Sequence, residues 1–280
     1  MTIPTTPIPT VELIGGTHMP MIGLGTWPLA GDECVRAVGT ALRAGYRLID
    51  TAEGYRNEAE VGHAIRTSAV PRSDIFLTTK FSKQWHSFDG VYRAAENSLK
   101  RLGLDYIDLF LMHWPMPHEG DFVAAFEGMV ALRESGLVKA IGVSNFKVHH
   151  LEKLIAKGLV PEVNQIQLDP TRPRKEVRPY LDDHDIVTEA WSPLGRGDDG
   201  LMRAPEVLQA AATHGVTPAA VVLAWQINQS IVVVPKSADP DHQRTNLEAA
   251  GVELSAAEMD AIGALENPDA DLEDSDTGGN

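Results

Sequence analysis

Cysteine is almost missing from this sequence, because Cys34 is the single one among 280 residues. A lone cysteine excludes an intramolecular disulfide framework and a zinc site built from several thiolates. It is typical of a reducing compartment, so we expect a cytoplasmic protein in which Cys34 is inert. The first ten residues, MTIPTTPIPT, also lack the basic and apolar regions of a secretory signal.

Basic residues are few as well, with 24 lysines and arginines against 39 acidic residues and a net charge of −15. A surface of that sign repels phosphate backbones, so we do not expect nucleic acid as a partner. Part of the acidity is local, because residues 267–280 carry several carboxylates and no basic side chain. We predict that this segment is a disordered, solvated tail.

The chain has no long, uninterrupted apolar run. The stretch 215–235 lacks charged residues, but Gln226, Asn228, Gln229 and Ser230 interrupt its middle. A helix in lipid would not place three amides and a hydroxyl there, so we expect a soluble protein with no membrane partner.

What the chain does have is a regular alternation of short β-branched runs and amphipathic stretches. Eight apolar runs are typical of buried parallel strands: 21–25, 47–50, 75–79, 107–112, 140–143, 163–167, 186–189 and 231–234. Helical periodicity follows them at 32–44, 57–67, 88–102, 121–135, 147–157, 174–182, 204–228 (divided at Gly215) and 241–250. Eight such units predict a closed (β/α)8 TIM barrel. The alternative, an open doubly wound sheet, favours a G-x-G-x-x-G turn after the first strand, which GLGTWPLAGDE does not provide.

The same pattern predicts a single barrel domain over residues 11–266, between a flexible N-terminus at 1–10 and the tail at 267–280. Ahead of the first unit, the turn at Gly15-Gly16 predicts a β-hairpin that plugs the N-terminal mouth of the barrel. Ser255, followed three residues later by Glu258, forms a capping box that predicts a last helix over 255–265.

Titratable side chains stand where three consecutive apolar runs end. Asp50 closes the second run and Tyr55 follows it, Lys80 comes directly after the third, and His113 directly after the fourth. In a barrel the carboxyl ends of the strands meet at one mouth, where the chemistry takes place. Taken singly, Asp50 fits a helix N-cap, Tyr55 a loop residue and His113 a satisfied core histidine. Taken together, the four predict a catalytic set.

This set suits the reduction of an aldehyde or ketone, in which the carbonyl oxygen becomes negative as hydride arrives at carbon. Tyr55 would donate the proton, and the Lys80 ammonium beside it would lower the pKa of the phenol. Asp50 would keep Lys80 charged and fixed, and His113 would orient the carbonyl. A metal is not expected, because the chain has no H-E-x-x-H motif, and the absence of G-x-S-x-G argues against a serine hydrolase.

Eight segments resemble the aldo-keto reductase superfamily, in that family's order over about residues 11–255. They are GLGTW (23–27), DTAEGYRNE (50–58), LTTK (77–80), LMHWP (111–115), IGVSNF (141–146), NQIQ (164–167), WSPLG (191–195) and VPKS (234–237). The short segment 116–121 is similar to that of the bacterial 2,5-diketo-gluconate reductase type. The resemblance implies an NADPH-dependent reductase of aldehydes, α-dicarbonyls or keto sugars.

The resemblance also implies a cofactor site at the same mouth. Trp191 would stack on the nicotinamide ring, beside residues that hold its carboxamide, and Lys236 would take the 2′-phosphate. The full set implied to contact the cofactor is Thr26, Trp27, Ser144, Asn145, Gln165, Trp191, Ser192, Leu194, Gly195, Lys236, Ser237, His242, Arg244 and Asn246.

One position departs from the family pattern. Six residues after the lysine of the PKS block, where the family usually has an arginine that binds the 2′-phosphate, this chain has His242, and Arg244 follows two residues later. In a helix that begins near residue 241, the side chains at 242 and 244 point about 200° apart around the axis. Arg244 therefore does not simply substitute for the family's arginine. We therefore expect NADPH as the cofactor, with a weaker preference over NADH.

Three tryptophans next to strand ends, Trp27, Trp85 and Trp114, are candidates for lining an apolar substrate pocket. Trp85 lies in the altered segment KFSKQW and is equally well explained by packing at the rim. The glycine-rich loop 195–203 either covers the cofactor or moves without a gating role.

Two other functions fit parts of the pattern. A cofactor-bound regulatory subunit would bind NADPH without turnover. A phosphosugar isomerase would use Lys236 and Ser237 as a phosphate site, but it leaves Tyr55, Lys80 and His113 unexplained. A monomer is the default expectation for the oligomeric state.

Overall fold

The computed structural model describes residues 8–197 and 199–279. Its main sheet has eight parallel strands, which follow one another in chain order. They are β3 (Gly23–Gly25), β4 (Leu48–Asp50), β5 (Phe76–Phe81), β6 (Ile107–Met112), β7 (Val138–Ser144), β8 (Val163–Gln167), β9 (Val187–Trp191) and β10 (Val232–Val233). Bridges from Ile22 to Val233 and from Gly25 to Lys236 join the first strand to the last. The predicted TIM barrel is confirmed, and the open sheet is excluded.

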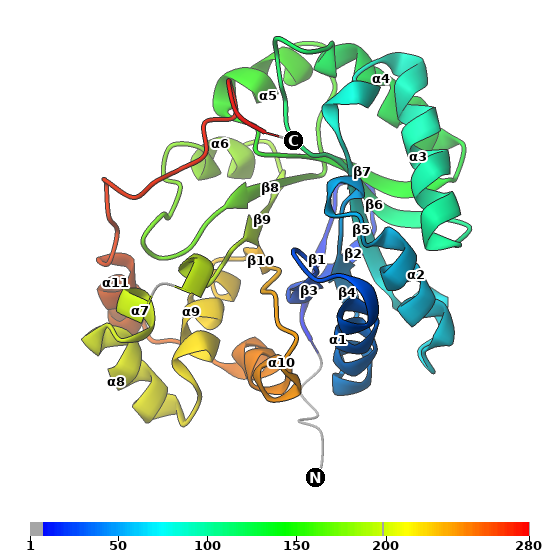
Figure 1. Ribbon diagram of the computed structural model, residues 1–280. Coiled ribbons are helices and arrows are strands. Elements are labelled where there is room, and N and C mark those ends of the chain that lie inside the picture. The colour runs from blue at the N-terminus through cyan, green and yellow to red at the C-terminus, as the bar shows by residue number, and fades with distance from the viewer. Residues whose placement is uncertain (1–7, 198, 280) are drawn as a thin grey trace.

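Helices surround the strands, as Figure 1 shows. They are α1 (Gly31–Ala44), α2 (Glu58–Thr67), α3 (Phe88–Leu102), α4 (Phe122–Glu134), α5 (Val148–Ile155), α6 (Arg178–Asp182), α7 (Asp199–Met202), α8 (Pro205–His214), α9 (Pro218–Ile227), α10 (Pro240–Leu247) and α11 (Ala256–Gly263). The division at Gly215 is confirmed, because this glycine ends α8 with a φ of 66°. The capping box of Ser255 and Glu258 is also present at the start of α11.

Helix α6 is shorter than the sequence pattern predicts. It begins at Arg178 rather than at residue 174. Arg174 has a φ of 55°, in the left-handed region, which an α-helix of L-residues does not accommodate. The preceding residues instead form a loop in which Asp169 accepts hydrogen bonds from Thr171 and Arg172.

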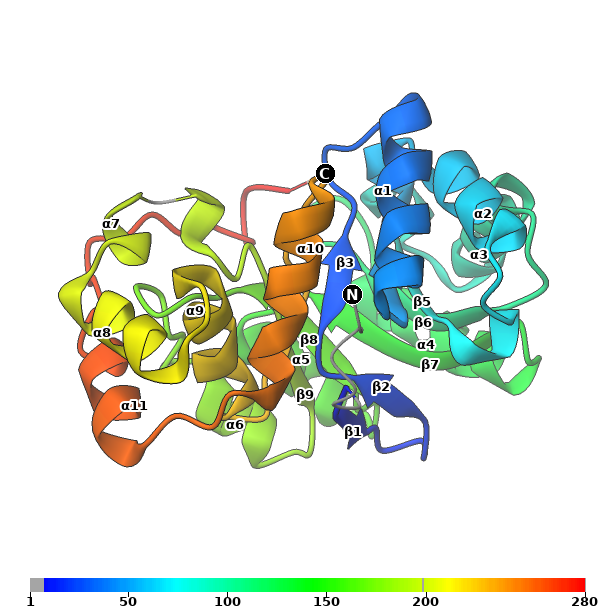
Figure 2. The same ribbon diagram turned by 90° about the horizontal axis from the view of Figure 1, so that it is seen from below.

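An antiparallel hairpin of β1 (Thr10–Glu12) and β2 (His18–Pro20) lies at the N-terminal end of the barrel, beneath β3 in the view of Figure 2. Its side chains Leu13 and Met19 are buried in one apolar cluster with residues of the barrel interior, including Leu48 and Leu109. The predicted hairpin therefore closes this mouth, and it leaves the opposite mouth for a ligand.

The barrel interior changes character along its length. Inward-facing positions alternate along each strand, and the layer nearest the hairpin is apolar, with Leu48, Val163 and Val187 in one cluster. Two residues further along β4, β8 and β9, the same face carries Asp50, Gln165 and Glu189, all of them buried. On the inward faces of these three strands, the polar side chains thus lie at the carboxyl end of the barrel.

No single helix among the described residues is long and apolar enough to cross a membrane. The pair α8 and α9 has the composition for it together, but it bends by 92° at its break.

The acidic C-terminal segment is placed against the barrel. After α11 the chain passes the loop that precedes α6, where the Asn267 N–H donates to the Thr171 carbonyl, and continues to Lys147 just before α5; Figure 1 shows it in red. Ser275 is buried, and Arg172 donates to the Asp271 carbonyl. Most residues of the segment are exposed, and basic side chains of the barrel pair with its carboxylates, Lys147 with Asp274 and Arg196 with Glu273. Residues 1–7, 198 and 280 of the predicted N-terminus, loop and tail lie outside the described residues.

Candidate active site

Asp50, Tyr55 and Lys80 form a connected group at the carboxyl ends of β4 and β5. The Lys80 ammonium lies 2.8 Å from both oxygens of Asp50 and donates to the Tyr55 hydroxyl over 3.3 Å. Lys80 is fully buried, and a fourth hydrogen bond joins it to the Thr51 carbonyl at 3.1 Å. The ring of His113 lies edge-on to that of Tyr55, with centroids 5.7 Å apart. The fold thus brings all four predicted residues together.

Asn57 holds the loop that carries Tyr55. Its buried amide donates to the carbonyls of Thr26 and Leu29, and its oxygen accepts from Thr51. Tyr55 itself ends a single 3-10 turn, Glu53–Tyr55, just ahead of Asn57. Asn57 stands in the segment DTAEGYRNE, but its role could not be predicted from the sequence, since its partners Thr26 and Leu29 lie far away in the chain.

The electrostatics of the group follow from burial and from the one ion pair. Burial alone would lower the pKa of Lys80, but the charges of Asp50 and Tyr55 raise it by more than burial lowers it. The pKa therefore lies above its ordinary value, and Lys80 stays charged. Burial raises the pKa of Tyr55, and Lys80 opposes this without cancelling it. The effect of Lys80 has the predicted sign, but the net shift of the phenol is upward. At neutral pH Tyr55 therefore carries its proton.

His113 is an uncharged imidazole in this site. Burial, and then the charge of Lys80, lowers its pKa to about 3. Its Nδ1 has no hydrogen-bond partner among the described residues. A neutral imidazole has one N–H to donate, which suits an interaction with a carbonyl oxygen.

A second group stands at the ends of β7, β8 and β9. Asn145 has a φ of 63°, a left-handed conformation that asparagine tolerates better than most residues. Its amide donates to the His113 carbonyl and to Ser144, and its oxygen accepts the indole N–H of Trp191 at 2.8 Å. The Gln165 amide donates to Asp50 Oδ2 at 2.9 Å, which links the two groups.

Both groups face one cavity of about 860 Å³, a volume that includes its open mouth. Its lining combines an aromatic wall, several amides and hydroxyls, and the exposed cation Lys236. The lining residues are Gly25, Thr26, Trp27, Asp50, Tyr55, His113, Trp114, Ser144, Asn145, Gln165, Trp191, Ser192, Arg196, Val234, Lys236 and Glu273. A flat ring face beside amides, with a cation further along, fits a nicotinamide dinucleotide whose phosphates extend toward Lys236.

Several residues that the sequence assigned to the cofactor lie beyond the cavity lining among the described residues: Leu194, Gly195, Ser237, His242, Arg244 and Asn246. His242 and Arg244 are exposed on α10, and Arg244 lies 3.4 Å from Glu248, the residue that follows this helix. Asn246 is buried. The structure therefore leaves the outer part of the predicted cofactor site, near α10, as a surface rather than a cavity.

Trp85 is not brought to the cavity, which corrects its place in the predicted substrate pocket. Its indole N–H lies 3.1 and 3.0 Å from the two oxygens of Glu53. The altered segment KFSKQW forms a 3-10 turn, Lys83–Trp85, that carries the ring to this carboxylate. Trp27 and Trp114 do line the cavity, and Trp27 is 63% exposed at its rim.

Two charged lining residues, Arg196 and Glu273, had no role assigned from the sequence. Arg196 lies with its guanidinium carbon 5.3 Å from the centre of the Trp191 ring, and it pairs with Glu273 of the tail at 2.8 Å. The glycine-rich loop 195–203 was singled out, but its contact with the tail could not be predicted from sequence, since the two segments lie far apart in the chain.

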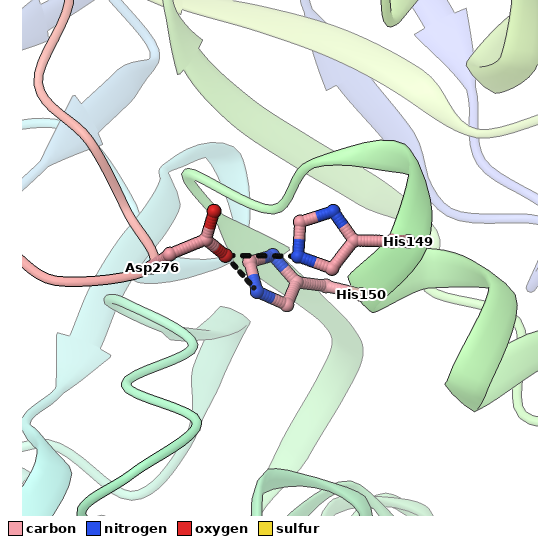
Figure 3. Close-up of side chains that lie close together, drawn as sticks. All are labelled: His149, His150 and Asp276. Carbon is pink, nitrogen blue, oxygen red and sulfur yellow. Dashed lines mark hydrogen bonds and ion pairs between the residues drawn. The ribbon is translucent and has the colours of Figure 1, made fainter.

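Within residues 8–197 and 199–279, one group of side chains has the spacing of a metal site: His149, His150 and Asp276. Figure 3 shows both imidazoles directed at the same carboxylate. His149 Nε2 and His150 Nε2 lie 2.8 and 2.9 Å from Asp276 Oδ1.

The protonation of His150 argues against a metal there. Its Nδ1 accepts the backbone N–H of Lys147 at 3.2 Å, so the proton of the neutral ring is on Nε2, the atom that faces Asp276. The other oxygen of Asp276 lies 2.6 Å from the Lys147 ammonium. The cluster is therefore an ion-paired anchor for the tail.

Comparison with known proteins gives a consistent result. The model of the aldo/keto reductase family matches residues 21–267. The chain is 44% identical to the 2,5-diketo-D-gluconic acid reductase B of a Corynebacterium species over 92% of this chain and 94% of that protein. It is 40% identical to the methylglyoxal reductase DkgA of Escherichia coli, again over 92% and 94%. A crystal structure of a Bombyx mori aldo-keto reductase in complex with NADP is 31% identical, with a TM-score of 0.87 and coverage of 94% of both chains.

Proposed function

The chain belongs to the aldo/keto reductase family, whose members are NADP(H)-dependent oxidoreductases. On this premise we propose that it reduces small aldehydes, α-dicarbonyls or keto sugars, with Tyr55 as the proton donor. The observation that carries the proposal is the contact of the Tyr55 hydroxyl with Lys80 in a cavity that His113 also lines. The names of the two curated relatives support the substrate classes.

The cofactor, when bound, supplies the hydride. The chain's own residues would then prepare the carbonyl oxygen for the charge that it gains. Tyr55 holds a proton at neutral pH because burial keeps the pKa of its phenol high. His113, being neutral, would donate its one N–H to the same oxygen and so fix the carbonyl between two donors.

Lys80 has a double role in this proposal. As Tyr55 gives up its proton, the ammonium 3.3 Å away stabilises the phenolate, and Asp50 keeps that ammonium in place. Both charges are already paired, so little reorganisation accompanies the transfer. No metal is assigned to the reaction, since the four side chains account for the proton and for the charge.

The cofactor would lie along the wall formed by Trp191, Asn145 and Ser144, with the nicotinamide against the indole face. Gln165, already bound to Asp50, would place the carboxamide beside the catalytic group. Lys236 would take the 2′-phosphate of NADPH. Arg244 is engaged with Glu248, which supports a weaker preference for NADPH over NADH than an arginine at position 242 would give.

The test is a series of absorbance measurements at the nicotinamide band. Purified protein and NADPH are combined with a panel of simple aldehydes, α-dicarbonyls and keto sugars, and tryptophan quenching by NADPH is recorded alongside. Oxidation that depends on a carbonyl establishes the reductase, and the panel ranks the substrates. Quenching without oxidation across the panel would contradict the proposal and favour a regulatory, cofactor-binding role.

A further inference from the structure

Glu189 is a buried acid that the reaction described above does not use. It lies in the middle of β9, two residues before Trp191, and its exposed fraction is zero. In the strand register it stands opposite Gln165 of β8 and Val232 of β10. Val187, two residues earlier on the same face, belongs to the apolar interior. Glu189 therefore lies inside the barrel, on the boundary between its polar and apolar layers, and outside the cavity lining.

The surroundings of Glu189 do not suit a carboxylate ion. Neither of its oxygens has a hydrogen-bond partner within residues 8–197 and 199–279. Gln165, opposite it in the register, donates its amide to Asp50 Oδ2 at 2.9 Å. A buried, ionised carboxylate without donors is strongly destabilised, whereas the protonated acid is much less so.

The charges around Glu189 come from three other elements. They are Asp50 on β4, Lys80 on β5 and Tyr55 on the turn after β4. The Lys80 ammonium already contacts both oxygens of Asp50 and is the cation of this group. The site therefore holds two acids and one buried cation that is committed to the first of them.

We propose that Glu189 is a positioning residue of the hydride-transfer site: it is held there as a neutral carboxylic acid, and its ionised form holds the proton on Tyr55. The inference rests on the proposed function, because it assigns Tyr55 the proton that is transferred. It adds a second, titratable carboxyl to the four residues of the catalytic group.

The pKa values agree with the geometry. Burial, and then the negative charge of Asp50, raises the pKa of Glu189 to about 8. The nearby Gln165 amide, whose hydrogen bond goes to Asp50, and the charge of Lys80 lower the pKa by less. The coupling is reciprocal, because the charge of Glu189 raises the pKa of both Tyr55 and Lys80.

The two directions of the reaction should respond differently. Carbonyl reduction needs the protonated phenol, so ionised Glu189 extends reduction to higher pH. Alcohol oxidation needs the phenolate as a base, so ionised Glu189 delays the rise of oxidation with pH. Glu189 thus favours reduction at alkaline pH without contacting the substrate.

The experiment compares wild type with Glu189→Gln, which keeps the size and remains neutral at every pH. The pH dependence of kcat/KM is recorded for NADPH-dependent reduction and for NADP-dependent oxidation. In the variant, we expect the alkaline fall of reduction and the onset of oxidation to move to lower pH by about one unit. Profiles that coincide with those of wild type would overturn the inference.

A matched control is Glu162→Gln, at the other end of the barrel. Glu162 is also buried, but it accepts hydrogen bonds from Gly15, Ile141 and Arg133. Its substitution should leave both pH profiles in place. An equal displacement in this control would show that loss of any buried carboxyl suffices, which would also overturn the inference.

A second measurement does not need turnover or a folded variant. Infrared spectra of the wild-type protein should contain the band of a protonated carboxylic acid at pH 7, and the band should disappear as the pH rises through about 8. Absence of the band at pH 7 would overturn the inference. If the band is present but no carbonyl supports NADPH oxidation, the proposed function fails and the protonation of Glu189 stands.

Discussion

The indole N–H of Trp191 donates to the side-chain oxygen of Asn145 over 2.8 Å. Because the amide of Asn145 donates in turn to the His113 carbonyl, one chain of contacts links the ends of β6, β7 and β9. The aromatic wall of the cavity is therefore positioned by the same residue that supports the backbone of His113.

This relationship predicts the effect of Trp191→Phe. The substitution keeps a ring but removes the donor, so Asn145 loses a partner and we expect the Kd for NADPH to rise about tenfold. Calorimetric titration measures the change. Trp225→Phe is the control, because that indole donates to the Met259 carbonyl outside the barrel and its loss should leave the Kd unchanged.

Tyr55→Phe tests the proton donor. The variant lacks the transferable proton, so kcat for carbonyl reduction should fall by about 10²–10⁴ while NADPH still quenches tryptophan fluorescence. Steady-state rates and a fluorescence titration give the two values. Tyr180→Phe, on α6 beside His184, is the control and should keep its rate. Wild-type turnover in Tyr55→Phe would refute the assigned role.

Asp50→Asn should lower the stability of the fold. It leaves the fully buried ammonium of Lys80 without its counter-charge, and we expect about 3–5 kcal/mol less free energy of unfolding in urea. The pKa of Lys80 is higher in the folded protein than in the unfolded chain, where it is about 10.4. The stability that this ion pair contributes is therefore complete below about pH 10.4 and is lost as the pH rises through the pKa of Lys80 in the folded protein.

Asp108→Asn is the comparison for Asp50. Asp108 also pairs with two cations, Arg72 and Lys139, but their side chains are 21% and 44% exposed, so water solvates them after the change. Its cost should be smaller. An equal or larger loss for Asp108→Asn would contradict the account of the buried pair.

Lys236→Ala tests the 2′-phosphate contact. The variant should bind NADPH about tenfold to a hundredfold more weakly and NADH almost as wild type does, because only NADPH carries the added charge. Kd values for both cofactors are compared with those of Lys100→Ala, a control on α3. An equal loss for the two cofactors would argue against the contact.

The anchor of the tail should depend on acid and salt. The hydrogen bond from Lys147 lowers the pKa of Asp274 to about 2. Slight burial raises the pKa of Asp276, but Lys147 and His149 outweigh it and lower the value. The ion pairs are thus fully formed when the pH is above the ordinary pKa of an aspartate. They are lost as the pH falls through the lowered pKa values of Asp274 and Asp276. Burial lowers the pKa of His150 to about 4, so that ring is not the switch at neutral pH.

The corresponding variant is Asp274→Asn combined with Asp276→Asn. We expect faster amide hydrogen exchange in residues 267–279 than in wild type, and a smaller further increase with added salt. Asp269→Asn, in the same segment but away from Lys147, is the control. Unchanged exchange in the double variant would show that other contacts hold the tail.

The sequence by itself determined the barrel and the position of its chemistry. Eight β-branched runs alternate with amphipathic stretches, and such runs can be buried on both faces only in a parallel sheet covered by helices. Asp50, Lys80 and His113 stand at or directly after the ends of these runs, so closing the sheet brings them to one mouth. Local signals with a fixed geometry, such as Gly215 and the pair Ser255 and Glu258, were equally readable.

Only the tertiary structure decided the contacts between segments distant in the chain. Arg174 has a left-handed φ, so α6 begins only after it, and the indole N–H of Trp85 donates to Glu53 rather than facing the cavity. The tail is acidic enough to be solvated, but Lys147, from a different unit of the barrel, holds it. Glu189 lies two residues before Trp191, yet its importance comes from its distance to Asp50 and Lys80 across the barrel. Burial and the pairing of charges depend on such distances, which composition and periodicity do not encode.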